Sequence, residues 1–395
     1  MTHLRTAVAV FGTLVATLGM TAGPASASAL SQTGSTTAVY NFGVFESHGA
    51  LVQLGHRRPT LVTGISGTVV QIATSNSDSY ALTSSGTVWA WGAGHNGELG
   101  NGTRVDHSAS AVQVAFPAGV KISFLANPMP YDGALAVDSQ GGVWGWGVNI
   151  GHELCLRGTQ PLLLPTPLPL SNVTLATGAG LHSLFYSRGT VYACGQGKDG
   201  ELGDGTAYDH ATPTAVVGLP AGGVKSLQSS WRGSGALMNN GSYYDWGFNH
   251  SGQLGNGTRR DSSVPVRVPL PAAVTQVSQG GSLWNNGQTL ALLSDGSLWA
   301  WGNGRWGQLG NGGYRSSSIP VRVDLPAGVS FSQVISGGYT SYGITASGAL
   351  WSWGANKYGQ LGNGSTARIQ RRPAPAGAVM SQLSSTAANV AGYSN

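Results

Sequence analysis

Short apolar runs separated by turn residues recur along the chain, and residues 290–335 are representative. Four runs, at 290–293, 297–302, 319–323 and 331–335, alternate with segments rich in Gly, Asn, Asp and Pro. Such runs between turn signals are typical of β-strands. The pattern predicts a unit of four strands joined by tight turns, with residues 290–293 as the inner strand.

The unit repeats along the chain with a period of about 51 residues, the signature of a repeat architecture. Each copy contains an aromatic residue followed by Gly, and one copy has Cys in place of the aromatic residue. Trp299 and Trp301 stand two apart, so both side chains are expected on one face of their strand. The seven copies are centred on Gly43, Gly92, Gly147, Gly195, Gly247, Gly302 and Gly354.

Seven four-stranded units can bury their faces by stacking around an axis, which predicts an all-β, seven-bladed β-propeller over residues 30–395. The first unit has no apolar run before the strand at 39–43. Residues 387–395 follow a complete seventh unit. We therefore expect this C-terminal tail to supply the innermost strand of the first blade and to close the ring.

The repeated turn G-Q-L-G-x-G after the aromatic-Gly strand resembles that of the regulator of chromosome condensation repeat family. Three copies match it closely, two have Glu for Gln, one departs at 153–158, and the first keeps only 53–55. The resemblance covers nearly all of the chain after the N-terminal segment and implies a propeller. Its best-known member is a nuclear guanine nucleotide exchange factor. That activity implies an intracellular GTPase, and the secretion signal predicted below argues against it. The five matching turns are 97–103, 200–206, 252–258, 307–312 and 359–364.

Composition agrees with a sheet protein. Of 395 residues, 62 are Gly and only 9% are charged, too few for the exposed faces of long helices. Twelve Trp and 13 Tyr supply apolar surface that disordered chains lack. The formal net charge of +5 is too small to predict a nucleic-acid partner.

The N-terminal segment has the layout of a secretory signal peptide, predicted over residues 1–29. Arg5 precedes an apolar run, and A-x-A sites allow cleavage after Ala27 or Ala29. The run is shorter than the roughly 18 apolar residues that a membrane-spanning helix needs. A secreted, extracellular protein without a membrane span is expected.

No catalytic, cofactor-binding or metal-binding constellation emerges from the sequence. Three segments fit G-x-G-x-x-G, but no helix is expected after them, and Asn149, Asn249 and Asn356 replace the middle Gly in other copies. Gly and Asn both tolerate positive φ, so a turn explains the motif better than phosphate binding. The sequence predicts a protein that is not an enzyme.

Three carboxylates, Glu98, Glu153 and Glu201, occupy the turn position that Gln holds in other copies. A neutral amide serves equally well there, so a structural hydrogen bond is a better account than acid-base chemistry.

The two cysteines fall in adjacent blades. Cys155 replaces the second Gly of a G-Q-L-G turn, and Cys194 replaces the Trp before Gly. An oxidising compartment favours a disulfide between them, with a buried thiol at Cys194 as the alternative.

Nine of the 12 Trp lie at the two repeated strand positions and are expected in the core, whereas Trp231, Trp284 and Trp306 lie in loops. In an up-and-down blade the connections before the inner strand and after the aromatic-Gly strand share one end. Exposed Trp, Tyr and Arg there have the composition of a binding hot spot, although these loops could simply cap the blades. The predicted binding face comprises Trp231, Arg232, His250, Trp284, Arg305, Trp306, Tyr339 and Tyr358.

These features predict a monomeric, secreted propeller scaffold that binds another extracellular protein and needs no cofactor. A carbohydrate or cell-wall lectin is the main alternative, because aromatic rings also stack on sugars. Paired arginines at 57–58, 259–260 and 371–372 could meet anionic wall polymers, or form a solvated rim. Similar architecture in the propeller type of β-lactamase inhibitory protein adds enzyme inhibition as a further possibility, although its repeats lack the G-Q-L-G-N-G turn. An enzyme is the least favoured alternative.

Overall fold

A computed structural model describes the backbone at 14–18, 38–47 and 50–61, and side chains as well over 62–75, 77–281 and 287–356. It also describes parts of 361–379. Every regular element in these residues is a β-strand, and none of them forms a helix able to cross a membrane. The predicted all-β class is confirmed.

The strands form seven antiparallel sheets, one with three strands and six with four. The three-stranded sheet contains β1 (Leu14–Leu18), β2 (Ala38–Ser47) and β3 (Ala50–Leu61). The next three sheets contain β4 (Val69–Thr74), β5 (Asp78–Thr83), β6 (Val88–Gly94) and β7 (Val105–Gln113); β8 (Ile122–Leu125), β9 (Gly133–Asp138), β10 (Val143–Gly147) and β11 (Leu162–Pro167); β12 (Val173–Ala179), β13 (His182–Ser187), β14 (Thr190–Gly195) and β15 (His210–Ala215). The last three contain β16 (Val224–Ser230), β17 (Gly233–Met238), β18 (Tyr243–Gly247) and β19 (Ser262–Arg267); β20 (Val274–Gly280), β21 (Gln288–Leu293), β22 (Leu298–Gly302) and β23 (Ser317–Arg322); β24 (Gln333–Ser336), β25 (Thr340–Ile344), β26 (Ala349–Ala355) and β27 (Ile369–Val379).

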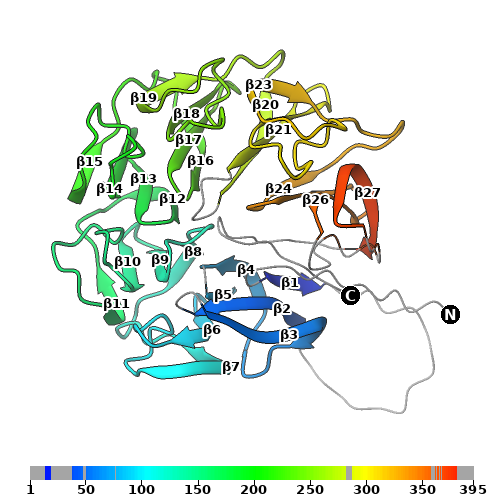
Figure 1. Ribbon diagram of the computed structural model, residues 1–395. Coiled ribbons are helices and arrows are strands. Elements are labelled where there is room, and N and C mark those ends of the chain that lie inside the picture. The colour runs from blue at the N-terminus through cyan, green and yellow to red at the C-terminus, as the bar shows by residue number, and fades with distance from the viewer. Residues whose placement is uncertain are drawn as a thin grey trace, which may run out of the picture.

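The sheets are arranged around a common centre as in a propeller (Figure 1). Each four-stranded sheet runs in chain order, and its first strand lies nearest the centre. First strands of successive sheets contact one another, as β12 does with β16 and β20 with β24. That the sheets form seven blades in a closed ring stays a prediction.

The sheets begin one strand earlier than the repeat units of the sequence. The run at 331–335, expected as the last strand of its unit, forms β24, the first strand of the next sheet. The run at 290–293, expected innermost, belongs to β21, the second strand of its sheet. The prediction was wrong by one strand, because a repeat reads the same from any starting point.

The first sheet contains an unexpected strand. β1 pairs with β2 and lies within the predicted signal peptide, so cleavage after Ala27 or Ala29 would remove it. The C-terminal tail at 387–395 lies outside the described residues. Signal cleavage and closure by the tail therefore stay predictions.

Tryptophans of the third strands build the core between sheets. The second aromatic residue of each pair is buried, as Trp146, Trp246 and Trp353 show, and the first, Trp144, Tyr244 or Trp351, is half-buried against the same core. The indole Nε1 atoms of the buried Trp residues donate to a backbone carbonyl in the turn of the preceding sheet: that of Glu98, Glu201 and Gln308, respectively, at 2.8–2.9 Å. This repeated latch joins neighbouring sheets and confirms the core assignment.

The outermost strands share a second regularity. Six of the seven, all except β7, contain at least one Pro. Pro165 of β11, Pro265 of β19 and Pro320 of β23 fall where the pairing with the neighbouring strand is interrupted. Pro has no backbone N–H and is tolerated in sheets at edges and bulges. The prolines are Pro59, Pro165, Pro167, Pro213, Pro265, Pro320, Pro373 and Pro375.

Candidate functional site

The connections between first and second strands and between third and fourth strands meet at one end of the sheets, here called the loop face. Two contacts show this. Arg232, between β16 and β17, pairs with Asp199, between β14 and β15. Trp306, between β22 and β23, packs against Tyr339, between β24 and β25. Each contact joins adjacent sheets, as the strand topology predicts.

Trp306 is the most exposed of the predicted tryptophans that the structure describes, at 40%. Its ring meets that of Tyr339 edge to face, with centroids 6.2 Å apart. Its backbone N–H donates to Gln308 Oε1 at 2.8 Å, and the N–H of exposed Arg305 donates to Asn303 Oδ1 at 2.9 Å. A tight turn thus fixes the position of a solvent-facing aromatic side chain.

Trp231 forms a second aromatic pair with Tyr131, which lies between β8 and β9. The ring centroids are 5.2 Å apart and the rings are nearly perpendicular. Gly180 lies between them along the face: its carbonyl accepts from the Tyr131 N–H at 2.8 Å, and a side chain at Gly180 would overlap the Trp231 backbone. Three consecutive sheets therefore contribute to this cluster. Tyr131 was missed from the sequence, although it occupies the same kind of loop.

Arg232 and His250 lie on the same face, but their side chains already have contacts. The Arg232 guanidinium pairs with Asp199 and lies 4.3 Å from the centre of the Phe248 ring. His250 is exposed, with its Nε2 3.6 Å from Asp261 Oδ2. Arg232 fixes neighbouring loops to each other and is less available to a partner than the sequence suggested.

The other two predicted face residues, Trp284 and Tyr358, lie outside the described residues.

The turn carboxylates have the structural role predicted from the Glu and Gln exchange. Oε2 of Glu153 accepts from the Gly151 N–H at 2.7 Å, and Gln308 makes the same bond to the N–H two residues before it. Oε2 of Glu201 accepts from the Asp199 N–H at 2.8 Å. Burial raises the pKa of Glu153 and of Glu201 to about 7. These groups are hydrogen-bond acceptors inside turns.

The middle position of the G-x-G-x-x-G segments was explained wrongly. Neither Gly197 nor its counterpart Asn249 has a positive φ. The Asn249 side chain bridges its loop, donating from Nδ2 to the Arg260 carbonyl and accepting from the Leu254 N–H. At Gly197 the backbone near Tyr208 comes so close that a side chain would overlap it. Gly at this position lets another part of the backbone approach closely, whereas the Asn side chain bridges a wider loop by hydrogen bonds.

Comparison with known proteins agrees with this architecture. The sequence pattern of the regulator of chromosome condensation (RCC1) repeat matches residues 85–127, 240–283, 295–344 and 347–388, and a second pattern of that repeat matches 331–360. The chain contains RCC1 repeats.

Known proteins of different lengths are similar to this chain in sequence. The human E3 ubiquitin-protein ligase HERC2 is 29% identical over 77% of this chain, but the match spans only 6% of HERC2. The ultraviolet-B receptor UVR8 of Arabidopsis thaliana is 29% identical over 79% of this chain and 72% of its own length.

Solved structures show the same fold. Prp20p of Saccharomyces cerevisiae has a TM-score of 0.67 and 22% identity, covering 78% of this chain and 76% of its own. Human WBSCR16 has a TM-score of 0.70 and 21% identity, covering 82% and 85%. At these identities the likeness establishes the fold alone.

The two cysteines are a paired departure from the RCC1 repeat. Cys155 and Cys194 form a disulfide that joins a turn of one sheet to β14 of the next. In regular copies the corresponding Gly has no room for a side chain, since a Cβ at Gly203 or Gly310 would lie 2.6–2.7 Å from the indole of the next sheet. Here that indole is replaced by Cys194. The disulfide thus takes the place of the indole latch between these two sheets.

Proposed function

We propose that the protein is a secreted propeller scaffold that binds another extracellular protein through its loop face. The Trp306 and Tyr339 pair with Arg305 carries this proposal. Trp, Tyr and Arg dominate interface hot spots, and a partner gains most from side chains that are already held in place. Trp306 meets both conditions, being partly exposed and fixed by its turn.

Two further observations support an extracellular setting. The N-terminal segment has the layout of a signal peptide, and the chain contains a disulfide. Disulfides persist mainly in oxidising compartments. Protein binding by this fold has a precedent in Prp20p, whose structure was described with its binding to Gsp1p and histones.

The test is capture of binding partners from culture supernatant by the immobilised mature protein. Trp306→Ala should release the captured protein, as expected for loss of a hot spot costing roughly 2 kcal/mol or more. Ile319→Ala, which truncates a 53% exposed apolar residue on β23 of the same sheet, is the matched control and should capture normally. If both variants capture as well as the unmodified protein does, the loop face is not the binding surface.

Binding to an anionic wall polymer is a second candidate, favoured by one contact. The Arg371 guanidinium lies 5.0 Å from the centre of the exposed Tyr314 ring, on the outer side of adjacent sheets. Stacked Arg and Tyr can bind both anionic and sugar groups. A glycan array with Arg371→Ala beside Trp306→Ala separates the two candidates, because each variant removes only one surface.

A further inference from the structure

One four-stranded sheet has a buried acid where the other five have a small neutral residue. Asp245 on β18 is 1% exposed. The residue at the same place, immediately before the residue that precedes the strand-ending Gly, is Ala, Gly or Ser in the other four-stranded sheets. These counterparts are Ala90, Gly145, Ala193, Ala300 and Ser352. Because burying a carboxylate is costly, this exception calls for a compensating partner.

A second exception faces it from the next sheet. Gln279 on β20 is 9% exposed and donates from Nε2 to Asp245 Oδ1 at 2.7 Å. The corresponding residues of other first strands, identified by their pairing, are smaller: Thr74, Gly178, Ser229 and Ser336. The two exceptional residues therefore touch each other, across one boundary between sheets.

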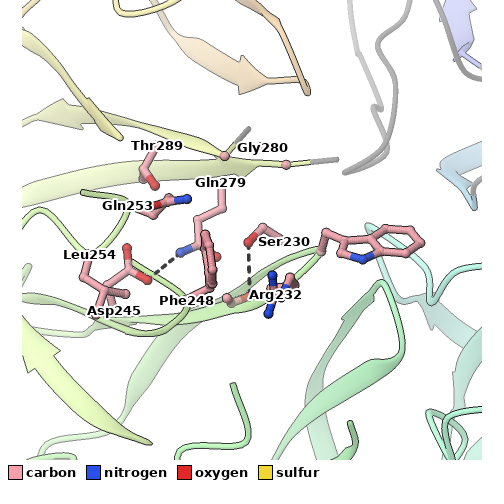
Figure 2. Close-up of a pocket in the computed structure, with 13 residues that line it drawn as sticks. Ser230, Arg232, Asp245, Phe248, Gln253, Leu254, Gln279, Gly280 and Thr289 are labelled. Atoms are coloured by element: carbon pink, nitrogen blue, oxygen red, sulfur yellow. Dashed lines mark hydrogen bonds between the residues drawn. The ribbon is translucent and has the colours of Figure 1, made fainter. Parts of the chain in front are cut away.

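The pair lines a cavity at this boundary (Figure 2). The cavity, about 20 Å³ in volume, is large enough for one water-sized group. Its lining runs from Ser230 and Arg232 on the loop face inward to Thr289 and Asp245. Two buried acceptor atoms of lining residues, Asp245 Oδ2 and Gln279 Oε1, have no hydrogen-bond partner among the described residues. These two acceptors lie on the lining, and the Nε1 of Trp301, a buried donor without a hydrogen-bond partner among the described residues, interacts with Asp245 from outside the cavity.

No cation compensates the carboxylate within the described part of the chain. Burial raises the Asp245 pKa well above its usual value, and the groups that oppose this are neutral: Gln279, the Trp246 backbone and the Trp301 indole. The one cationic side chain lining the cavity, Arg232, is paired with Asp199. With only a water molecule in the cavity, the raised pKa favours protonated, neutral Asp245, whereas a cation there would stabilise the carboxylate.

We propose that this cavity binds a primary ammonium group. An ammonium head is about the size of water, carries the missing positive charge, and offers three N–H donors to Asp245 Oδ2 and Gln279 Oε1. The group could belong to a small amine or to a lysine side chain of a bound protein. The first possibility is independent of the proposed function, whereas the second rests on it.

Methylammonium is a suitable probe, and potassium, which has no donors, is its matched control. Thermal melts and isothermal titration of the mature protein should show stabilisation and binding with methylammonium chloride but not with potassium chloride. Asp245→Asn removes the charge at constant shape, and Gln279→Ser restores the residue of two other blades. Each should weaken methylammonium binding by roughly tenfold or more.

Equal responses to the two salts, or unchanged methylammonium binding in Asp245→Asn, would overturn the proposal in favour of a buried water. Should one variant fail to fold, the other still gives the comparison. Capture from supernatant then distinguishes the sources. Loss of capture in Asp245→Asn, with competition by methylammonium in the unmodified protein, assigns the group to a partner lysine. Normal capture by Asp245→Asn, when the unmodified protein binds methylammonium and the variant does not, assigns it to a small amine. Loss of capture in Trp306→Ala but not in Asp245→Asn supports partner binding through the loop face without a lysine in the cavity.

Discussion

Replacing the buried turn carboxylate Glu201 by Gln should make the protein less sensitive to pH. Glu201 is 2% exposed and its Oε2 accepts from the Asp199 N–H. The Gln308 side chain makes the same bond in another repeat, so the amide fits the turn. Only the ability to ionise is lost.

The magnitude follows from the pKa. Burial raises the Glu201 pKa from 4.5 to about 7, with a smaller increase from Asp199 opposed by Arg232. Between these two values the native state binds more protons than the unfolded state, so stability falls as pH rises and the loss is complete above 7. The difference of about 2.5 pKa units corresponds to about 3 kcal/mol. Glu153, whose pKa is also raised to about 7 by burial, should behave in the same way.

Urea unfolding at one pH below 4.5 and one above 7 measures the effect. Relative to the unmodified protein, Glu201→Gln should gain about 3 kcal/mol between the two conditions. Gln308→Glu is the reverse control and should lose stability above neutrality. Parallel pH profiles for Glu201→Gln and the unmodified protein would refute the reasoning, since they would show that the buried carboxylate does not titrate abnormally.

Three further predictions concern the disulfide, the C-terminal tail and the loop face. Removing the disulfide with Cys155→Ser should lower the free energy of unfolding by roughly 2–5 kcal/mol, measured in urea. Reduction of the unmodified protein should have the same effect, and no change would mean that the disulfide does not stabilise the contact between these two sheets. Deleting 386–395 should lower the melting temperature, and an unchanged melt would count against closure by the tail. Trp306→Ala should leave the urea midpoint nearly unchanged, whereas buried Trp301→Ala should cost roughly 3–5 kcal/mol; equal losses would place Trp306 in the core.

The fold was largely predictable because its signals are local and repeated. The aromatic-Gly strands and the G-Q-L-G turns fix strands, turns and period from neighbouring residues alone. The start of each sheet was not predictable in the same way, since every strand of a continuous meander has a similar neighbour on each side. β24 was therefore assigned to the wrong sheet.

The site was less predictable because its contacts cross sheet boundaries. Trp306 stood out as a tryptophan outside the repeat register, but nothing local marked Arg232 as already paired with Asp199. Asp245 did carry a signal, because it is an acid at a position where the other four-stranded sheets have Ala, Gly or Ser, and alignment of the copies could have revealed it. Its significance depends on Gln279, which lies on the next sheet.

The prolines of the outer strands restrict how any partner can dock. A partner that adds a strand to a sheet needs an uninterrupted row of backbone donors and acceptors along the exposed edge. On six of the seven outer strands at least one Pro breaks that row. The same interruption hinders two copies from joining edge to edge when they are concentrated, as during export. Recognition is thereby directed away from main-chain pairing at the circumference and towards side chains presented at the ends of the blades.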